Sequence, residues 1–241
     1  MYHWKTSQLS TTRKMFLFTQ SAWGAFLGLL FPSHCISCGR EGSYFCAHCR
    51  GKLPEENTMA VRGVISLWSY ENEIVKKAVR ELKYHGKQML ARDLAASLYD
   101  KVLETIAEDL SYCDPLGTHA DIEKYILIPI PMHPARQRSR GYNQAELLAK
   151  EIALLGPEFF TCETNILVKN RETESQVSVH DREKRLRNIR GSFSVAHPER
   201  TAGKNVILID DVVTTGATLA EARKTLLTAG AKRVLSITVA H

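Results

Sequence analysis

The stretch VILIDDVVTTGAT (206–218) places two adjacent acids between an apolar run and a turn rich in threonine. VILID (206–210) predicts a β-strand, because short runs rich in Val and Ile are typical of strands buried in a sheet. Asp210 and Asp211 then carry two carboxylates that repel each other at the edge of a core. We therefore expect a positive charge or a group of hydroxyls to lie opposite them.

The residues after the two acids predict an anion-binding loop. The helical pattern LAEARKTLLTA (219–229) follows, so the turn lies at a helix N-terminus, where backbone N–H groups favour an anion. The lysine of a Walker-type loop is missing, which disfavours a nucleoside triphosphate. A sugar phosphate fits this pattern, because the loop would hold its phosphate and the carboxylates would accept hydrogen bonds from its ribose hydroxyls. The loop residues are Val213, Thr214, Thr215, Gly216, Ala217 and Thr218.

Strand and helix patterns alternate along most of the chain. This alternation predicts an α/β fold with a mainly parallel sheet flanked by helices, in which ligands bind at the carboxyl ends of the strands. Residues 210–218 lie at such an end. We expect strands at 64–70, 125–130, 206–210 and 233–240, and helices at 71–84, 88–110, 143–155 and 219–229.

The composition is that of an ordinary globular protein with a mild positive charge. The 241 residues include 32 Lys and Arg against 26 Asp and Glu, a formal net charge of +6. This charge favours anionic partners, either phosphorylated metabolites or nucleic acid, without choosing between them. A solvated surface without such a partner is the alternative.

An apolar segment near the N-terminus, MFLFTQSAWGAFLGLLF (15–31), resembles a signal peptide only superficially. Polar residues interrupt it, no small-residue cleavage site follows, and it is short for a membrane span of about 20 apolar residues. Its apolar residues recur at helical spacing, which predicts an amphipathic helix packed on the protein and ended by Pro32. Peripheral membrane contact is the alternative. We expect a cytoplasmic protein without stable membrane insertion.

Four of the six cysteines form the pattern Cys35-x2-Cys38-x7-Cys46-x2-Cys49. Each Cys-x2-Cys pair can present two thiolates to one ion, and Gly39 and Gly42 suit the turns. Four thiolates in a tetrahedral array indicate a structural zinc site, with iron as the competing metal. Two disulfides or a redox-active pair are the alternatives, which a reducing cytosol disfavours. We expect His34 and His48 to be bystanders, because four cysteines fill the coordination shell.

These patterns divide the chain into three parts. Residues 1–14 are an N-terminal tail, residues 15–53 hold the amphipathic helix and the four-cysteine knuckle, and residues 61–241 form the α/β domain. KLPEENTMA (52–60) is polar and contains a proline, as is typical of a linker.

VILIDDVVTTGAT is similar to the 5-phosphoribosyl-1-pyrophosphate (PRPP) loop of type I phosphoribosyltransferases. The wider chain resembles the competence protein F (ComF) family, which includes ComFC and GntX-like proteins. The stretches that carry this resemblance are PSHCISCG with FCAHC, LKYHG (82–86), IPIPMHPARQRSRGYNQAELLA (128–149) and RETESQVSVHDREKRLRNIRGSF (171–193). The resemblance implies a type I phosphoribosyltransferase-like fold with an N-terminal zinc knuckle of four cysteines. It also implies a link to DNA uptake in natural transformation.

The resemblance also implies roles for individual residues. Asp210 and Asp211 would bind the ribose hydroxyls of PRPP as candidate catalytic residues, and Thr214 to Thr218 would hold its 5-phosphate. Mg²⁺ would bridge pyrophosphate and ribose. Cations over the leaving pyrophosphate, not a protein nucleophile, would carry the catalysis. The place of the pyrophosphate loop is occupied by Pro131, Met132 and His133, and the segment 176–187, which contains Arg182, resembles the flexible lid that closes over PRPP.

Arg136, Arg138 and Arg140 alternate in a segment without acids (125–145). Guanidinium groups pair with phosphates in bidentate fashion, so we assign Arg136, Arg140 and Arg182 to pyrophosphate. The alternation is compatible with an extended loop that sends two of the three arginines to one side. Binding of a DNA backbone and an ordinary solvated surface are alternative roles.

The acceptor of the phosphoribosyl group is not indicated, because no glutaminase nucleophile and no purine- or pyrimidine-recognition motif is identified. Three hypotheses remain. The first is a phosphoribosyltransferase with an unidentified acceptor. The second is a non-catalytic, PRPP-responsive protein that contacts single-stranded DNA or competence-machinery partners. The third is a structural zinc adaptor with a relict pocket, against which the intact Asp-Asp and Thr-Thr-Gly sequences argue.

Overall fold

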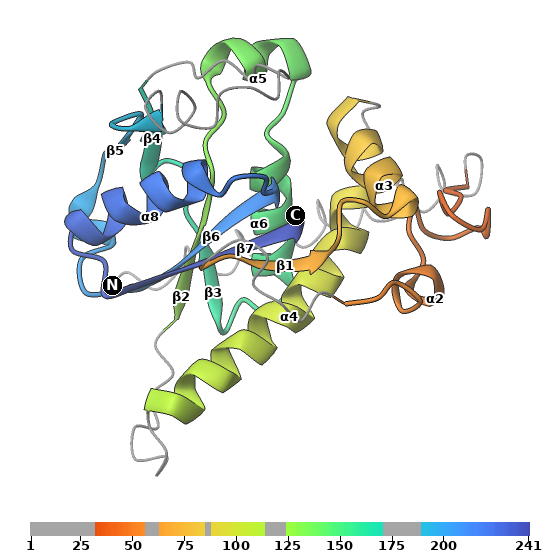
Figure 1. Cartoon of the computed structure of the whole chain (residues 1–241), viewed down its shortest axis with the longest axis horizontal. Helices are drawn as coiled ribbons and strands as arrows, with labels where there is room; N and C mark the ends of the chain where they lie inside the picture. The colour runs from red at the N-terminus through yellow and green to blue at the C-terminus, as the bar shows by residue number, and fades with distance from the viewer. Residues whose placement is uncertain (1–31, 56–62, 85–87, 114–123, 171–188) are drawn as a thin grey trace, which may run out of the picture.

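Strand β6 (Asn205–Val212) is the middle strand of a five-stranded sheet in the computed structural model of the protein (Figure 1). The strand order is β1-β7-β6-β2-β3, and every neighbouring pair is parallel. The carboxyl ends of the five strands therefore meet at one edge, and the predicted parallel sheet is confirmed. The other strands are β1 (Ile65–Trp68), β2 (Tyr125–Pro129), β3 (Phe160–Cys162) and β7 (Arg233–Ala240).

The structure describes residues 32–55, 63–84, 88–113, 124–170 and 189–241, without the side chains of 108–113. The tail 1–14, the predicted amphipathic helix at 15–31 and the lid segment 176–187 with Arg182 lie outside these ranges. Within them, no helix is both long and apolar enough to cross a membrane.

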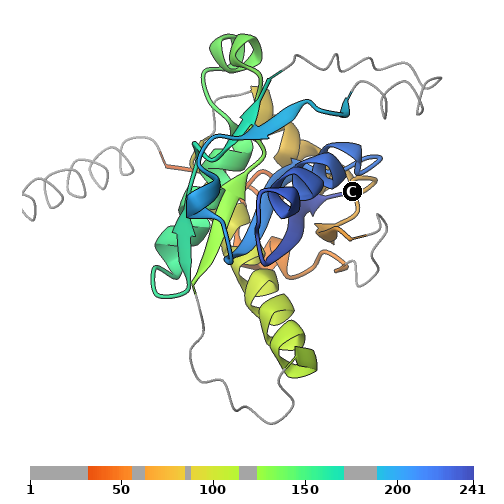
Figure 2. The same cartoon turned by 90° about the vertical axis from the view of Figure 1, so that its left-hand side faces the viewer.

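The side chains of β6 alternate between two hydrophobic cores, because successive residues of a strand point to opposite faces. Ile207 and Ile209 belong to a core with three helices, α3, α4 and α6. Val206 and Leu208 belong to a second core with α8 and the antiparallel pair β4–β5. Figures 1 and 2 show α8 on one side of the sheet and α4 with α6 on the other. The bounds are α3 (Glu73–Tyr84), α4 (Leu90–Cys113), α6 (Gln144–Leu155), α8 (Ala217–Thr228), β4 (Leu167–Lys169) and β5 (Phe193–Val195).

The segment with the alternating arginines is a helix, α5 (Pro134–Arg140), so the expectation of an extended loop is wrong. Pro134 occupies the first turn, where its missing N–H is not needed. His133 precedes it, and its Nδ1 accepts a hydrogen bond from the Ala135 N–H at 3.4 Å. Gly141, with φ of 89°, ends the helix in the left-handed conformation that favours glycine.

Several further elements differ from the sequence-based expectations. Strands β3, β4 and β5 have three residues each, too few for a periodic pattern. Helix α4 continues to Cys113, beyond the predicted end at residue 110. Strand β6 continues to Val212, so Asp210 and Asp211 lie within the strand, directly before its last residue. Helix α2 (Ala47–Arg50) and the short 3-10 helix η1 (Pro198–Arg200) were not predicted.

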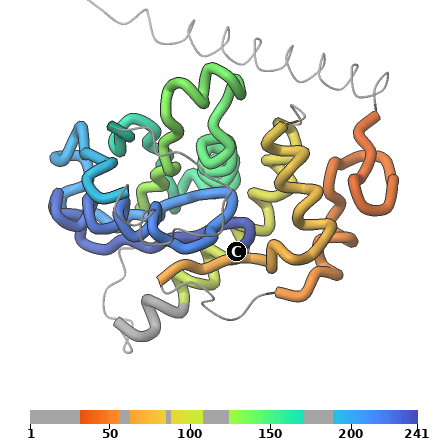
Figure 3. Tube along the Cα trace, turned by 45° about the horizontal axis from the view of Figure 1, so that its top comes forward, coloured from red at the N-terminus to blue at the C-terminus, as the bar shows by residue number. Residues whose placement is uncertain are grey.

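The four-cysteine module, defined as residues 33–53, packs directly on the α/β domain. Phe45 is fully buried, and its ring centroid lies 6.0 Å from that of Trp68 in β1. Lys77 of α3 donates from Nζ to the carbonyl of Ile36 at 2.7 Å. Figure 3 shows the module beside α3 and away from α8. The module and the sheet therefore share one hydrophobic core.

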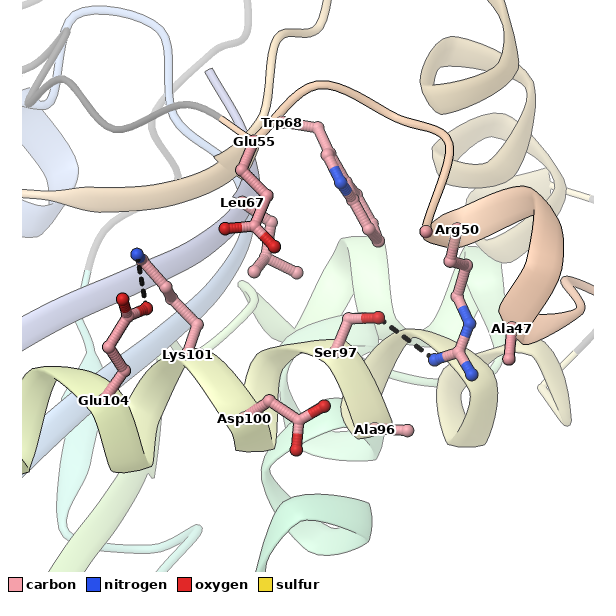
Figure 4. A pocket seen from close by; sticks show the side chains of 11 residues that line it. Ala47, Arg50, Glu55, Leu67, Trp68, Ala96, Ser97, Asp100, Lys101 and Glu104 are labelled. Atoms are coloured by element: carbon pink, nitrogen blue, oxygen red, sulfur yellow. Dashed lines mark hydrogen bonds and ion pairs between the residues drawn. The ribbon is translucent and has the colours of Figure 1, made fainter.

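Polar contacts also join the module to α4. The Phe45 N–H donates to the Asp93 carboxylate at 2.8 Å. Arg50 of α2 donates to the Asp93 carbonyl and, at 3.1 Å, to the Ser97 hydroxyl (Figure 4). Beside these contacts lies a cavity of about 520 Å³ between α2, β1 and α4. Asp93 thus holds the module through both its carboxylate and its carbonyl.

Asp93→Ala should destabilise the protein, because it removes the acceptor of the N–H of the buried Phe45. A buried donor without a partner costs about 1–3 kcal/mol, and we expect the free energy of unfolding in urea to fall by about that amount. Asp100→Ala, at an exposed position on the same helix, is the control and should change it by less than about 0.5 kcal/mol. Equal stability of the two variants would contradict the role given to Asp93.

Candidate functional site

A lysine lies opposite the two acids of β6, as the sequence required. Lys83, near the end of α3, places Nζ 3.1 Å from Oδ2 of Asp211. The side chains of both residues are largely buried, with 22% and 11% of their surfaces exposed. Burial lowers the pKa of Lys83, but the carboxylates of Asp211 and Asp210 outweigh it and raise the pKa. The ammonium group is therefore charged and serves as counter-ion of the pair.

Asp210 is the less compensated member of the pair. Burial and the neighbouring charge of Asp211 raise the pKa of Asp210 to about 7. The Asp211 N–H, which donates to Asp210 Oδ1 at 2.9 Å, and the charge of Lys83 act in the opposite direction without cancelling the shift. Asp210 therefore exchanges a proton near neutral pH in the ligand-free protein.

The loop between β6 and α8 leads directly into the N-terminus of a helix. Gly216, with φ of 74°, directly precedes α8, which has twelve residues. The Thr215 hydroxyl accepts from the Ala217 N–H at 3.4 Å. The Val213 N–H donates to the Ala240 carbonyl at 2.9 Å. Contrary to the expectation for the loop, this N–H group is bonded inside the protein and does not face an anion. The hydroxyls of the loop remain at the surface of a cavity described next.

A cavity of about 440 Å³ lies at the carboxyl edge of the sheet. It joins two segments that are far apart in the sequence, 130–145 and 210–218. Of the predicted residues, the cavity wall contains Pro131, Met132, Arg136, Arg140, Asp210, Asp211, Thr214, Thr215 and Thr218. Four predicted residues are not part of this wall: His133, Val213, Gly216 and Ala217. Polar wall residues to which the sequence had given no role are Lys83, Tyr84, Asn143, Gln144 and Lys169.

Helix α5 separates the three arginines. Arg136 and Arg140 are one helical turn apart and both line the cavity, whereas Arg138 is exposed and is not part of its wall. Arg140 donates from Nη1 to Gln144 Oε1 at 2.8 Å. Its guanidinium also lies 5.1 Å from the ring centroid of Tyr84, which is 68% exposed. Arg136 and Arg140 thus add two cations to the cavity wall that also contains the threonine loop (α5 is at the top of Figure 1).

Two hydrogen bonds fix the segment that follows α5. The Tyr142 hydroxyl donates to the Leu82 carbonyl at the end of α3. The Asn143 amide donates to the Ile130 carbonyl at 2.9 Å, and its Oδ1 accepts from the Ala145 N–H at 3.1 Å. Asn143 therefore caps the N-terminus of α6 and anchors the loop after β2 to the end of that strand. Tyr142 therefore ties this segment to α3.

A sequence signal existed for the most important unpredicted residue. LKYHG (82–86) follows a helical pattern, and the acids of β6 required a cation. The two observations were not connected because nothing in the sequence shows that α3 ends beside β6. Lys169 enters from β4, a strand too short to predict.

The four cysteines of the module converge as predicted. Their sulfur atoms all lie within 4.8 Å of one another, so the cluster can hold a metal ion. Gly39 and Gly42 have φ of 73° and 103°, which confirms that they make the turns. Burial disfavours the thiolate of Cys35, but backbone N–H groups, foremost that of Cys38, outweigh it and lower the pKa to about 6. Neither His34 nor His48 belongs to the cluster.

Asp210→Asn should make the protein more stable at pH 8. The folded-state pKa of Asp210, about 7, lies above the ordinary carboxyl value of about 3.9 in the unfolded chain. The native protein therefore loses stability as pH rises between these values, and the loss is complete above pH 7. We expect the free energy of unfolding in urea at pH 8 to be higher in the variant by about 1 kcal/mol or more. Near pH 4 the two proteins should be equally stable.

Asp100→Asn is the matched control, since Asp100 is an exposed aspartate on α4. Asp100→Asn should leave the difference in the free energy of unfolding between pH 4 and pH 8 as it is in the native protein. A native protein as stable as Asp210→Asn at pH 8 would refute the raised pKa.

The comparisons with known proteins agree with this geometry. A family model described as "Phosphoribosyl transferase domain" matches residues 138–241. Competence protein F of Haemophilus influenzae is 31% identical over 209 residues, covering 85% of this chain and 82% of the relative. Competence protein ComFC of Bacillus subtilis is 28% identical over 202 residues, covering 81% and 72%. DNA utilization protein YhgH of Salmonella typhi is 28% identical over 207 residues, covering 84% and 81%.

These matches confirm the resemblance and the fold class that the sequence predicted. They span both the four-cysteine module and the α/β domain. The chain belongs to the competence protein F (ComF) family, with a phosphoribosyltransferase-like domain behind an N-terminal cluster of four cysteines.

Proposed function

We propose that the protein binds PRPP with Mg²⁺ in the cavity at the carboxyl edge of the sheet and transfers its phosphoribosyl group to an acceptor not yet identified. One observation carries the proposal. Two carboxylates, a hydroxyl-rich loop before a helix and two arginines line a single cavity of about 440 Å³. Each of these three features matches one part of PRPP: the ribose hydroxyls, the 5-phosphate and the pyrophosphate.

The loop residues Thr214, Thr215 and Thr218 would hold the 5-phosphate, with the N-terminal end of α8 supplying partial positive charge. Asp210 and Asp211 would accept hydrogen bonds from the two ribose hydroxyls. Lys83 favours this role, because its ammonium group offsets the mutual repulsion of the carboxylates.

The transfer separates charge, so the surrounding charges decide its rate. Positive charge develops on the ribose as the bond from C1 to pyrophosphate breaks, and negative charge develops on the leaving group. Arg136 and Arg140 would stabilise the leaving pyrophosphate, and Asp210 and Asp211 would stabilise the sugar. Mg²⁺, bound mainly by oxygens of PRPP, would neutralise further charge on the pyrophosphate. No protein nucleophile is required.

The names of the relatives, competence protein and DNA utilization protein, support an accessory role in DNA uptake. We place this role in the cytoplasm. A second function, a non-catalytic adaptor that responds to PRPP and binds single-stranded DNA or competence-machinery proteins, is favoured by Arg138. This arginine is exposed and is not part of the cavity wall, so it is accessible to a DNA backbone. Release of pyrophosphate only when an acceptor is present supports the enzyme, and its absence with tight PRPP binding supports the adaptor.

The double variant Asp210→Asn with Asp211→Asn tests PRPP binding. It should weaken PRPP in calorimetric titrations with Mg²⁺ by at least tenfold, because each lost hydrogen bond to a charged group is worth about 1.5–3 kcal/mol. Ribose 5-phosphate should weaken as well, since it has the same hydroxyls. Asp100→Asn should bind both ligands like the native protein. Native PRPP affinity in the double variant would show that the site is misplaced.

We further propose that the four cysteines hold a structural zinc ion. The purified protein should contain close to one zinc per chain. Cys35→Ser should lower the melting temperature of the whole protein, because the module and the sheet share one core. Metal analysis and thermal unfolding check both statements. Reduced protein that contains neither zinc nor iron would refute the metal site.

A further inference from the structure

Gln144 is a polar residue of the cavity wall whose side chain is only half satisfied. It is 2% exposed, the most deeply buried polar group around the cavity among the described residues. Its Oε1 accepts from Arg140 at 2.8 Å, whereas its Nε2 has no hydrogen-bond partner in the part of the chain that the structure describes. A buried amide donor without a partner costs about 1–3 kcal/mol, so its retention needs an explanation.

The bond to Arg140 also fixes which way the amide faces. A guanidinium can only donate, so the atom that it contacts must be the oxygen of the amide. The Nε2 group, with its two N–H donors, therefore faces away from the Arg140 guanidinium. The Tyr142 hydroxyl lies within reach of the Gln144 side chain, and since it already donates to the Leu82 carbonyl, it can accept at most one of the two. At least one donor of Gln144 remains for a ligand.

The surroundings of this donor select an anion. Gln144 is the first residue of α6, whose twelve residues place about half a positive charge at this end. Arg136 and Arg140 line the same cavity, and Arg140 contacts Gln144 directly. The two acids of the wall belong to β6, where Asp211 pairs with Lys83 and the charge of Lys83 also acts on Asp210. An oxyanion is therefore the ligand that this end of the cavity fits.

We propose that Gln144 Nε2, together with the N-terminal turn of α6, binds the diphosphate group of the ligand alongside Arg136 and Arg140. The inference rests on the proposed PRPP site and adds to it a neutral donor from a separate helix. Since the amide carries no charge, it recognises a phosphate oxygen by direction and leaves the charge balance to the arginines. Gln144 thereby distinguishes ligands with a diphosphate at C1 from those without one.

The test compares Gln144→Glu with Gln137→Glu. The first change keeps the shape and the acceptor for Arg140 but replaces the donor with a negatively charged oxygen. The second makes the same change on α5 at an exposed residue outside the cavity wall. Gln144→Glu should weaken PRPP and inorganic pyrophosphate at least tenfold and ribose 5-phosphate less than twofold. Gln137→Glu should change none of the three by more than twofold.

A measurement on the native protein separates binding from a structural role. The side-chain amide signals of Gln144 in nitrogen-15 NMR spectra, assigned by their loss in Gln144→Met, should shift on addition of pyrophosphate and not of ribose 5-phosphate. Two outcomes overturn this inference and leave the proposed function standing. In one, the native protein binds PRPP while these signals do not shift. In the other, Gln144→Glu weakens pyrophosphate and ribose 5-phosphate equally. Native protein that binds neither PRPP nor pyrophosphate overturns the proposed function and this inference with it.

Discussion

The repulsion between Asp210 and Asp211 is the constraint on which the site depends. Two adjacent carboxylates at the end of the middle strand are unfavourable unless a cation is fixed beside them, and Lys83 is that cation. Its position is set by α3, which must end next to β6. The raised pKa of Asp210 shows that the compensation is incomplete. Such residual strain is common at functional sites, where a ligand relieves what the empty protein tolerates.

The parallel sheet brings the remaining parts of the site together. Because all five strands point the same way, the segments after β2 and β6 meet at one edge although about 80 residues separate them. The segment after β2 then needs its own supports. The Tyr142 and Asn143 side chains provide them, by hydrogen bonds to the ends of α3 and β2. Arg136 and Arg140 consequently line a cavity whose other wall is the threonine loop.

Local patterns were predictable and long-range partners were not. The acid pair, the threonine loop and the cysteine cluster are each contained in a short stretch, so their chemistry could be inferred from spacing. Lys83 and Gln144 contribute through contacts that depend on how α3 and α6 pack, which no local pattern encodes. Helix α5 is a different case, because Pro134 and Gly141 are local signals that mark its two ends, whereas the alternating arginines favour an extended segment. Three-residue strands such as β4 carry no period at all.

Helix α3 contacts both the four-cysteine module and the acids of the cavity. Lys77 bonds to the four-cysteine module, and Lys83, six residues later and about 9 Å along the same helix, pairs with Asp211. One helix of twelve residues thus carries both contacts, so a change in how the module packs on α3 would also move the counter-ion of the acids. If an ion in the module changes the affinity of the cavity for a ligand, thermodynamic reciprocity requires that the ligand change the affinity of the module for the ion by the same factor.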